Sequence, residues 1–225
     1  MAIDRHKVFI SFHSDDMRYK DYLINLNEYN FETHKIQSIF DDYSVGEGDI
    51  DDTNMTDEQV RIIIRDKFIK GASVLILLCG EHTKERKFVD WELHSAMFDT
   101  ENNPKMGIIV INLPFVSMFQ ACRIGEESEK NIVANPSANW TSFKNRTELE
   151  QNYPYMPSRI IDNFESLINN DDIIPITVVD WDKIANNSDS LKRLIDNAYC
   201  RSRNDNKHYN HSAPLMKRNR RHLFY

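Results

Sequence analysis

Residues 73–97, SVLILLCGEHTKERKFVDWELHSAM, decide the fold of this chain. The first seven form a continuous apolar run, as expected of a central parallel strand that is covered on both faces. An eight-residue loop separates this run from a helical pattern that extends to Asp99. The helical pattern places four apolar side chains on one stripe: Val89, Leu93, Ala96 and Met97. A strand, a loop and an amphipathic helix in this order are the building unit of an α/β sheet.

The alternation of strand and helix continues along the chain. Short apolar, β-branched and aromatic runs predict strands at residues 7–13, 35–40, 73–79, 106–113 and 173–179. Helical periodicity occupies the intervals at residues 14–30, 56–71, 88–99, 158–169 and 189–199. We therefore expect an α/β protein with a flavodoxin-like, doubly wound, parallel five-stranded sheet. Residues 1–200 are predicted to be a single domain, with an irregular insertion at 114–157 after the fourth strand, and residues 201–225 a basic tail.

The composition is that of a folded chain without a membrane span. Hydrophobic residues make up 40% and aromatic residues 11%, which is enough for a packed core. No run approaches the roughly 18 apolar residues of a membrane helix, and the N-terminus lacks the apolar region of a signal peptide. The three cysteines show no metal-binding spacing and predict no disulfide framework. We expect a cytoplasmic protein that binds no metal.

The charge is distributed unevenly. The net charge is −7, yet residues 201–225 contain seven Lys or Arg and one Asp. The remaining body is therefore strongly acidic, which argues against general nucleic-acid binding, because such binding depends on neutralising phosphates. The basic tail could contact RNA or a membrane, or it could fold back on the acidic surface of its own chain.

Glu92 is the first candidate for a reactive group. It lies at the edge of the apolar helical stripe, and its helix follows a strand whose carboxyl end should border a ligand crevice. The alternative is that Glu92 is a solvated charge early in a helix, where acids are favoured. The sequence does not indicate a dinucleotide-binding, phosphate-binding, serine-hydrolase or zinc site. It lacks the glycine motif, the phosphate-binding loop, the nucleophile elbow and the zinc-ligand pattern that such sites require.

The sequence resembles a TIR domain, and more narrowly the TIR-like proteins of prokaryotic Thoeris anti-phage defence. The resemblance rests first on FISFHSDD at residues 9–16 and FVDWEL at residues 88–93. It continues in YPYMPSRIID at 153–162, ITVVDWD at 176–182 and MKRNRR at 216–221. It therefore extends over nearly the whole chain.

The resemblance implies an enzyme of the NAD glycohydrolase or ADP-ribosyl cyclase type, in the EC 3.2.2 class. NAD would be its substrate rather than a cofactor, and the products would be nicotinamide and an ADP-ribose derivative, often cyclised, that acts as a second messenger. The implied partners are other TIR surfaces, a separate effector that responds to the diffusible messenger, and a phage-derived trigger. The family loop that rearranges on assembly corresponds to residues 41–54, which are acidic and lack proline here.

The resemblance also assigns roles to individual residues. Glu92 is the expected catalytic residue, and the residues expected to line the nucleotide site are Phe12, His13, Ser14 and Asp15. Trp91 could stack on a base or on nicotinamide; alternatively it packs on the insertion, because it lies almost opposite the buried stripe. His13, Ser14 and Asp15 could instead cap the end of the first strand and the start of the next helix.

A single carboxylate suits this chemistry. Nicotinamide leaves from a cationic ring nitrogen, so the leaving group requires no general acid, in contrast to glycosidases with two carboxylates. An ionised Glu92 can accept hydrogen bonds from ribose hydroxyls, and these strengthen as positive charge develops. Two alternatives remain open: a non-catalytic TIR adaptor that acts by self-association, and a glycosyl-transfer enzyme that acts on nucleosides.

Overall fold

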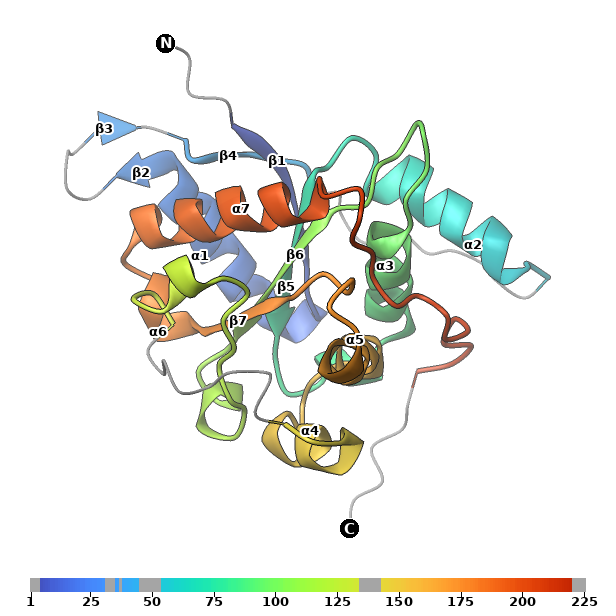
Figure 1. The fold of residues 1–225 in the computed structure, drawn as a ribbon. Helices are drawn as coiled ribbons and strands as arrows, with labels where there is room; N and C mark the ends of the chain where they lie inside the picture. The colour runs from blue at the N-terminus through green and yellow to red at the C-terminus, as the bar shows by residue number, and fades with distance from the viewer. Residues whose placement is uncertain (1–4, 31–34, 37, 45–53, 134–142, 220–225) are drawn as a thin grey trace.

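A five-stranded parallel sheet forms the centre of the molecule, with the strand order β4-β1-β5-β6-β7 (Figure 1). The computed structural model describes residues 5–30, 35–36, 38–44, 54–133 and 143–219. The strands are β1 (His6–Ser11), β4 (Phe40–Asp42), β5 (Val74–Cys79), β6 (Gly107–Asn112) and β7 (Thr177–Asp180). All four strand pairs are parallel. In order of occurrence the strands are arranged 2-1-3-4-5, so the predicted α/β, flavodoxin-like fold is confirmed.

Helices cover both faces of the sheet (Figure 1). One face carries α1 (Met17–Glu28), the short α6 (Trp181–Ile184) and α7 (Ser188–Ser202). The other carries α2 (Asp57–Ile63), α3 (Lys87–Met97) and α5 (Ser158–Asn169). Residues of β5 and β6 alternate between the two apolar clusters, and every residue of both strands is buried. This burial on both faces explains why both strands are almost uninterrupted apolar runs.

Shorter elements complete the described part of the chain. The turns of 3₁₀-helix are η1 (Ser14–Asp16), η3 (Thr83–Glu85), η4 (Val116–Met118) and η5 (Glu127–Glu129). A π-helical turn, η2 (Ile64–Phe68), continues α2, and Gly71 follows with a positive φ of 79°. Such a φ favours glycine because it has no Cβ. None of the described helices is long and apolar enough to cross a bilayer.

Two predicted strands are displaced from their expected positions. The second strand starts at Phe40 rather than Lys35, because residues 35–36 form β3 (Lys35–Ile36) of a separate antiparallel pair with β2 (Tyr29–Asn30). The fifth strand starts at Thr177 rather than Ile173. Pro175 interrupts it, since proline offers no N–H to a ladder, and Ile174 instead donates its N–H to the carbonyl oxygen of His208 at 2.9 Å.

The predicted insertion is partly regular. It contains η4, η5 and α4 (Arg146–Asn152), and Arg123 forms an antiparallel bridge with Val178 at the edge of β7. The guanidinium of Arg123 packs 3.8 Å from the ring centroid of Phe164 on α5. The expectation of a wholly irregular segment is therefore wrong for this part, whereas residues 134–142 lie outside the described residues. Most of the acidic loop at 41–54 also lies outside them, at residues 45–53.

The described part of the basic tail folds back on the domain. Residues 203–219 run along α5 and α3 (Figure 1). Lys217 forms an ion pair with Asp57 at the start of α2, and the backbone N–H of Leu215 donates to the same carboxylate at 3.1 Å. Of the three possibilities left open by the charge distribution, this segment adopts the one in which the tail meets the acidic surface of its own chain.

Candidate active site

Ser11 and Glu92 meet at the carboxyl edge of the sheet. The hydroxyl of Ser11, the last residue of β1, donates to Oε2 of Glu92 at 2.6 Å. Ser11 is fully buried, and Glu92 is half-buried in the second turn of α3. In this strand order the ligand crevice is expected between β1 and β5, where the direction of winding reverses. Glu92 therefore lies at the edge where this topology places a ligand site, on the border of the buried stripe as the helical pattern predicts.

The loop after β1 is organised by His13. This residue is buried, with 8% of its surface exposed, and Nδ1 accepts the backbone N–H of Asp15 at 3.0 Å, which caps η1. The capping group is thus His13, not the Ser14 that sequence patterns favour. Ser14 and Asp15 are exposed at the rim of the edge, where they remain accessible to a ligand. Phe12 is half-buried and packs against the apolar cluster beneath α1.

Asp16 is a second carboxylate at this edge, and it was not among the predicted site residues. A Cβ added to Gly80, the residue after β5, would lie only 2.1 Å from Oδ2 of Asp16. The carboxyl therefore lies directly against the backbone at the end of β5, and glycine permits this approach. Burial, reinforced by the neighbouring charge of Asp15, raises the pKa of Asp16 to about 6. Asp16 belongs to the same FHSDD run as His13, and this position in the sequence could have suggested it as a site residue.

Trp91 lies away from the open edge, contrary to its predicted role in the nucleotide site. Its side chain is 1% exposed, and Nε1 donates to the carbonyl oxygen of Met216 at 2.8 Å. Its ring is 5.0 Å from that of Phe88, measured between centroids. The hydrogen-bond partner of Trp91 thus belongs to the C-terminal segment and not to the insertion. The helical pattern placed Trp91 opposite the sheet, and residues 213–219 cover that side of α3.

A buried ion pair joins α3 to α5 and to the C-terminal segment. Arg159 donates to both oxygens of Asp90, from Nε at 2.8 Å and from Nη2 at 3.0 Å. Asp90 also accepts the backbone N–H of Met216 at 2.9 Å. At the start of α3, the backbone N–H of Lys87 donates to the side chain of Asn219 at 2.9 Å. The helix that carries Glu92 is thus fixed by contacts from residues more than sixty positions away.

Polar side chains also connect the ends of β5, β6 and β7. Asn112 donates to Asp180 at 3.1 Å and accepts from Gln120 at 2.7 Å. Gln120 in turn accepts the backbone N–H of Tyr155 at 2.8 Å. Burial raises the pKa of Asp180. This network ties the loops after β6 and α4 to the carboxyl edge, in keeping with a structural role for Asp180.

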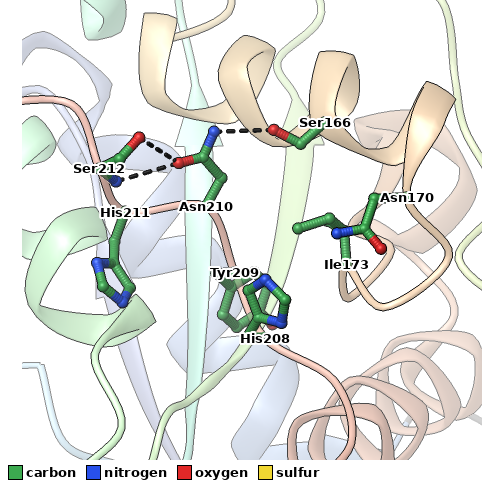
Figure 2. A pocket seen from close by; sticks show the side chains of 8 residues that line it. All are labelled: Ser166, Asn170, Ile173, His208, Tyr209, Asn210, His211 and Ser212. Atoms are coloured by element: carbon green, nitrogen blue, oxygen red, sulfur yellow. Dashed lines mark hydrogen bonds between the residues drawn. The ribbon is translucent and has the colours of Figure 1, made fainter.

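A pocket of about 490 Å³ lies elsewhere, between the end of α5 and the C-terminal segment (Figure 2). Asn210 spans its wall, donating to Ser166 at 2.8 Å and accepting from Ser212 at 2.7 Å (Figure 2). None of the predicted site residues lines this pocket. Within the described ranges no group of three or more His, Cys, Asp or Glu side chains is arranged to hold a metal ion.

Comparison with known families gives one match. Residues 9–117 match the family model described as Thoeris protein ThsB, TIR-like domain. Over these residues the chain is similar to a Thoeris TIR-like domain. The match runs from β1 past the end of β6, so it contains both partners of the Ser11–Glu92 hydrogen bond as well as Asp16. It covers just under half of the chain, and the expected resemblance of residues 153–221 to the same group stays a prediction. No curated protein matches the chain.

Proposed function

We propose that this protein cleaves NAD at the bond between nicotinamide and ribose, with Glu92 as the catalytic carboxylate. The observation that supports it best is the hydrogen bond from Ser11 to Glu92 at 2.6 Å, at the edge where this topology binds ligands. Phe12, Ser14 and Asp15 lie on the loop beside this edge and are the proposed nucleotide contacts. His13 shapes that loop through its bond to the backbone of Asp15.

The reaction breaks the C1′–N bond, and the bonding electron pair passes to the nicotinamide nitrogen, which was cationic. Positive charge develops on the ribose, and the carboxylate of Glu92 stabilises it through hydrogen bonds from the ribose hydroxyls. The hydroxyl of Ser11 holds Oε2 of Glu92 in a fixed direction, so the carboxylate need not reorganise during the reaction. An oxygen nucleophile then bonds to C1′ and releases its proton to solvent water.

When the nucleophile is water, the product is ADP-ribose; when it is a hydroxyl of the same molecule, the product is a cyclic ADP-ribose derivative. We propose the cyclic product as a diffusible second messenger that activates a separate effector after a phage-derived trigger. Because NAD is a cytoplasmic dinucleotide, this proposal places the protein in the cytoplasm. Self-association through TIR surfaces belongs to the same proposal.

The experiment is an NAD turnover assay with mass spectrometry of the products, with and without lysate from phage-infected cells. We expect nicotinamide release by the wild type, and the product mass identifies the messenger. If the folded protein released no nicotinamide under either condition, the enzyme proposal would be overturned in favour of a TIR adaptor. Turnover of nucleosides with NAD left intact would favour a nucleoside glycosyl-transfer enzyme.

A further inference from the structure

Exposed apolar side chains gather on the loop that follows β6. Among the described residues, six large hydrophobic side chains are exposed, and three of them lie within five positions here: Phe115 (48%), Met118 (77%) and Phe119 (49%). Exposed apolar side chains that cluster in this way are typical of binding surfaces, whereas scattered ones need no explanation. This loop is therefore a candidate for contact with a ligand.

Three aromatic rings form a defined surface on this loop. The ring centroids of Phe115 and Phe119 are 5.2 Å apart, and each lies 5.8 Å from that of Tyr155. We call Phe115, Phe119 and Tyr155 the aromatic platform. The backbone of Tyr155 is fixed at both ends, since its N–H donates to Gln120 at 2.8 Å and its carbonyl accepts from Cys79 Sγ at 3.4 Å. The platform is thus held against the end of β5.

The platform lies on the same edge of the sheet as Glu92. Its loop leaves the carboxyl end of β6, which pairs with β5, and β5 pairs in turn with β1. The end of β1 that carries Ser11 is therefore two strand spacings from the end of β6, or about 10 Å. A ligand that extends along this edge from Glu92 towards β6 reaches the platform.

A cation lies beside the platform. The ammonium nitrogen of Lys84 is 5.5 Å from the ring centroid of Tyr155, and it donates to the carbonyl oxygen of Pro154. Lys84 belongs to the loop between β5 and α3, which also carries Arg86 and the acidic Glu81 and Glu85. Of these charged residues, Lys84 is the one placed beside the platform. Rings beside an ammonium suit a ligand that joins an aromatic base to phosphate groups.

We propose that the aromatic platform stacks the purine base of the dinucleotide whose nicotinamide ribose lies at Glu92, with Lys84 beside the phosphates. The inference rests on the proposed function, because it names the subsite for the other half of the same substrate. Stacking of one base on aromatic side chains is worth about 10- to 100-fold in affinity. The platform would then determine affinity for the adenosine half without taking part in bond cleavage.

The test compares two substrates that share the scissile bond, NAD and nicotinamide mononucleotide, which lacks adenosine. In the double variant Phe115→Ala/Phe119→Ala we expect the KM for NAD to rise at least about 10-fold, with kcat and the KM for the mononucleotide unchanged. Ile62→Ala, which removes a similarly exposed apolar side chain from α2, is the matched control and should change neither KM. An equal rise in KM for both substrates, or no rise, would overturn the proposal.

A binding measurement separates this inference from the proposed function. Titration of AMP into the wild type should show binding that the double variant loses, even if no NAD is consumed. In that case the proposed cleavage of NAD would be wrong, whereas the proposed binding of the base by the aromatic platform would be supported. Equal binding of AMP to both proteins would overturn the platform. Sedimentation could also show dimers of the wild type and monomers of the double variant, with AMP binding unchanged. That result would overturn the base-binding proposal and show that the aromatic platform forms a contact between two copies of the chain.

Discussion

The hydroxyl of Ser11 donates to Oε2 of Glu92 at 2.6 Å and links the end of β1 to the second turn of α3. A hydrogen bond to a charged group contributes about 1.5–3 kcal/mol. We therefore expect Ser11→Ala to lower kcat for nicotinamide release by about 10- to 100-fold with little change in KM, and Ser11→Thr to restore part of the rate. Steady-state kinetics on both variants, with thermal unfolding to verify folding, provide the measurement. Unchanged kcat in Ser11→Ala would show that the bond does not orient the reacting carboxylate.

The Asp90–Arg159 pair should contribute far more to stability than an exposed network of similar size. Arg159→Met leaves the buried carboxylate of Asp90 without its partner, a change that costs about 3–5 kcal/mol. Arg146 contacts three carboxylates, but its side chain is 39% exposed, so Arg146→Met should cost less than about 1 kcal/mol. Denaturant unfolding of both variants measures the difference.

The same variant should also loosen the C-terminal segment. Arg159 donates to the carbonyl oxygens of Ala213 and Pro214 at 3.1 and 3.2 Å. Amide hydrogen exchange should accelerate at residues 213–217 in Arg159→Met and remain unchanged there in Arg146→Met. Equal losses of stability in the two variants, with no change in exchange, would contradict the described role of the pair.

Trp91 should affect stability but not substrate affinity. In Trp91→Phe the ring keeps much of its packing while the bond from Nε1 to Met216 is lost, at a cost of about 1 kcal/mol or more. We expect a lower unfolding midpoint and an unchanged KM for NAD. If the KM for NAD rose several-fold while the stability stayed normal, Trp91 would have to contact the nucleotide.

Asp16 should make stability depend on pH. Its pKa is raised to about 6 from 3.8, so the folded state binds the proton more tightly than the unfolded state does. This contribution is complete below about pH 4 and is lost as the pH rises through about 6. Since Asp16 is only half-buried, we expect a loss of about 1 kcal/mol rather than the full value of the shift.

The comparison is between the wild type and Asp16→Asn, by unfolding free energy at pH 4 and at pH 7. The variant should be more stable than the wild type at pH 7, and its stability should fall less between the two pH values. A decrease of the same size in both proteins would show that groups other than Asp16 cause it.

The sequence predicted those parts of the fold that depend on local pattern. β5 and β6 appear as uninterrupted apolar runs because both faces are covered, and the border position of Glu92 follows from helical geometry alone. The second and fifth strands begin later than predicted. Asn27 holds the backbone at the start of the second strand, and Pro175 interrupts the fifth. Asn27 accepts the N–H groups of Ile39 and Phe40 at 2.8 and 2.9 Å, a contact that no local pattern reveals.

In the candidate site, too, local pattern predicted some features and missed those that depend on distant contacts. Glu92 and the loop after β1 could be located from strand order, whereas the partner of Glu92 depends on how α3 packs against β1. The burial of Trp91 depends on Met216, which lies 125 positions along the chain. The pairing of Asp90 with Arg159 likewise spans 69 positions. Periodicity carries no information about contacts at such separations.

If Glu92 is the catalytic carboxylate for NAD cleavage, nicotinamide release should differ sharply between Glu92→Gln and Glu81→Gln. The second variant makes the same chemical change at an exposed position on the loop after β5. We expect release to be lost in Glu92→Gln, with the thermal unfolding midpoint close to that of the wild type, and to be retained at the wild-type level in Glu81→Gln. Release at the wild-type rate by a folded Glu92→Gln protein would contradict this role of Glu92.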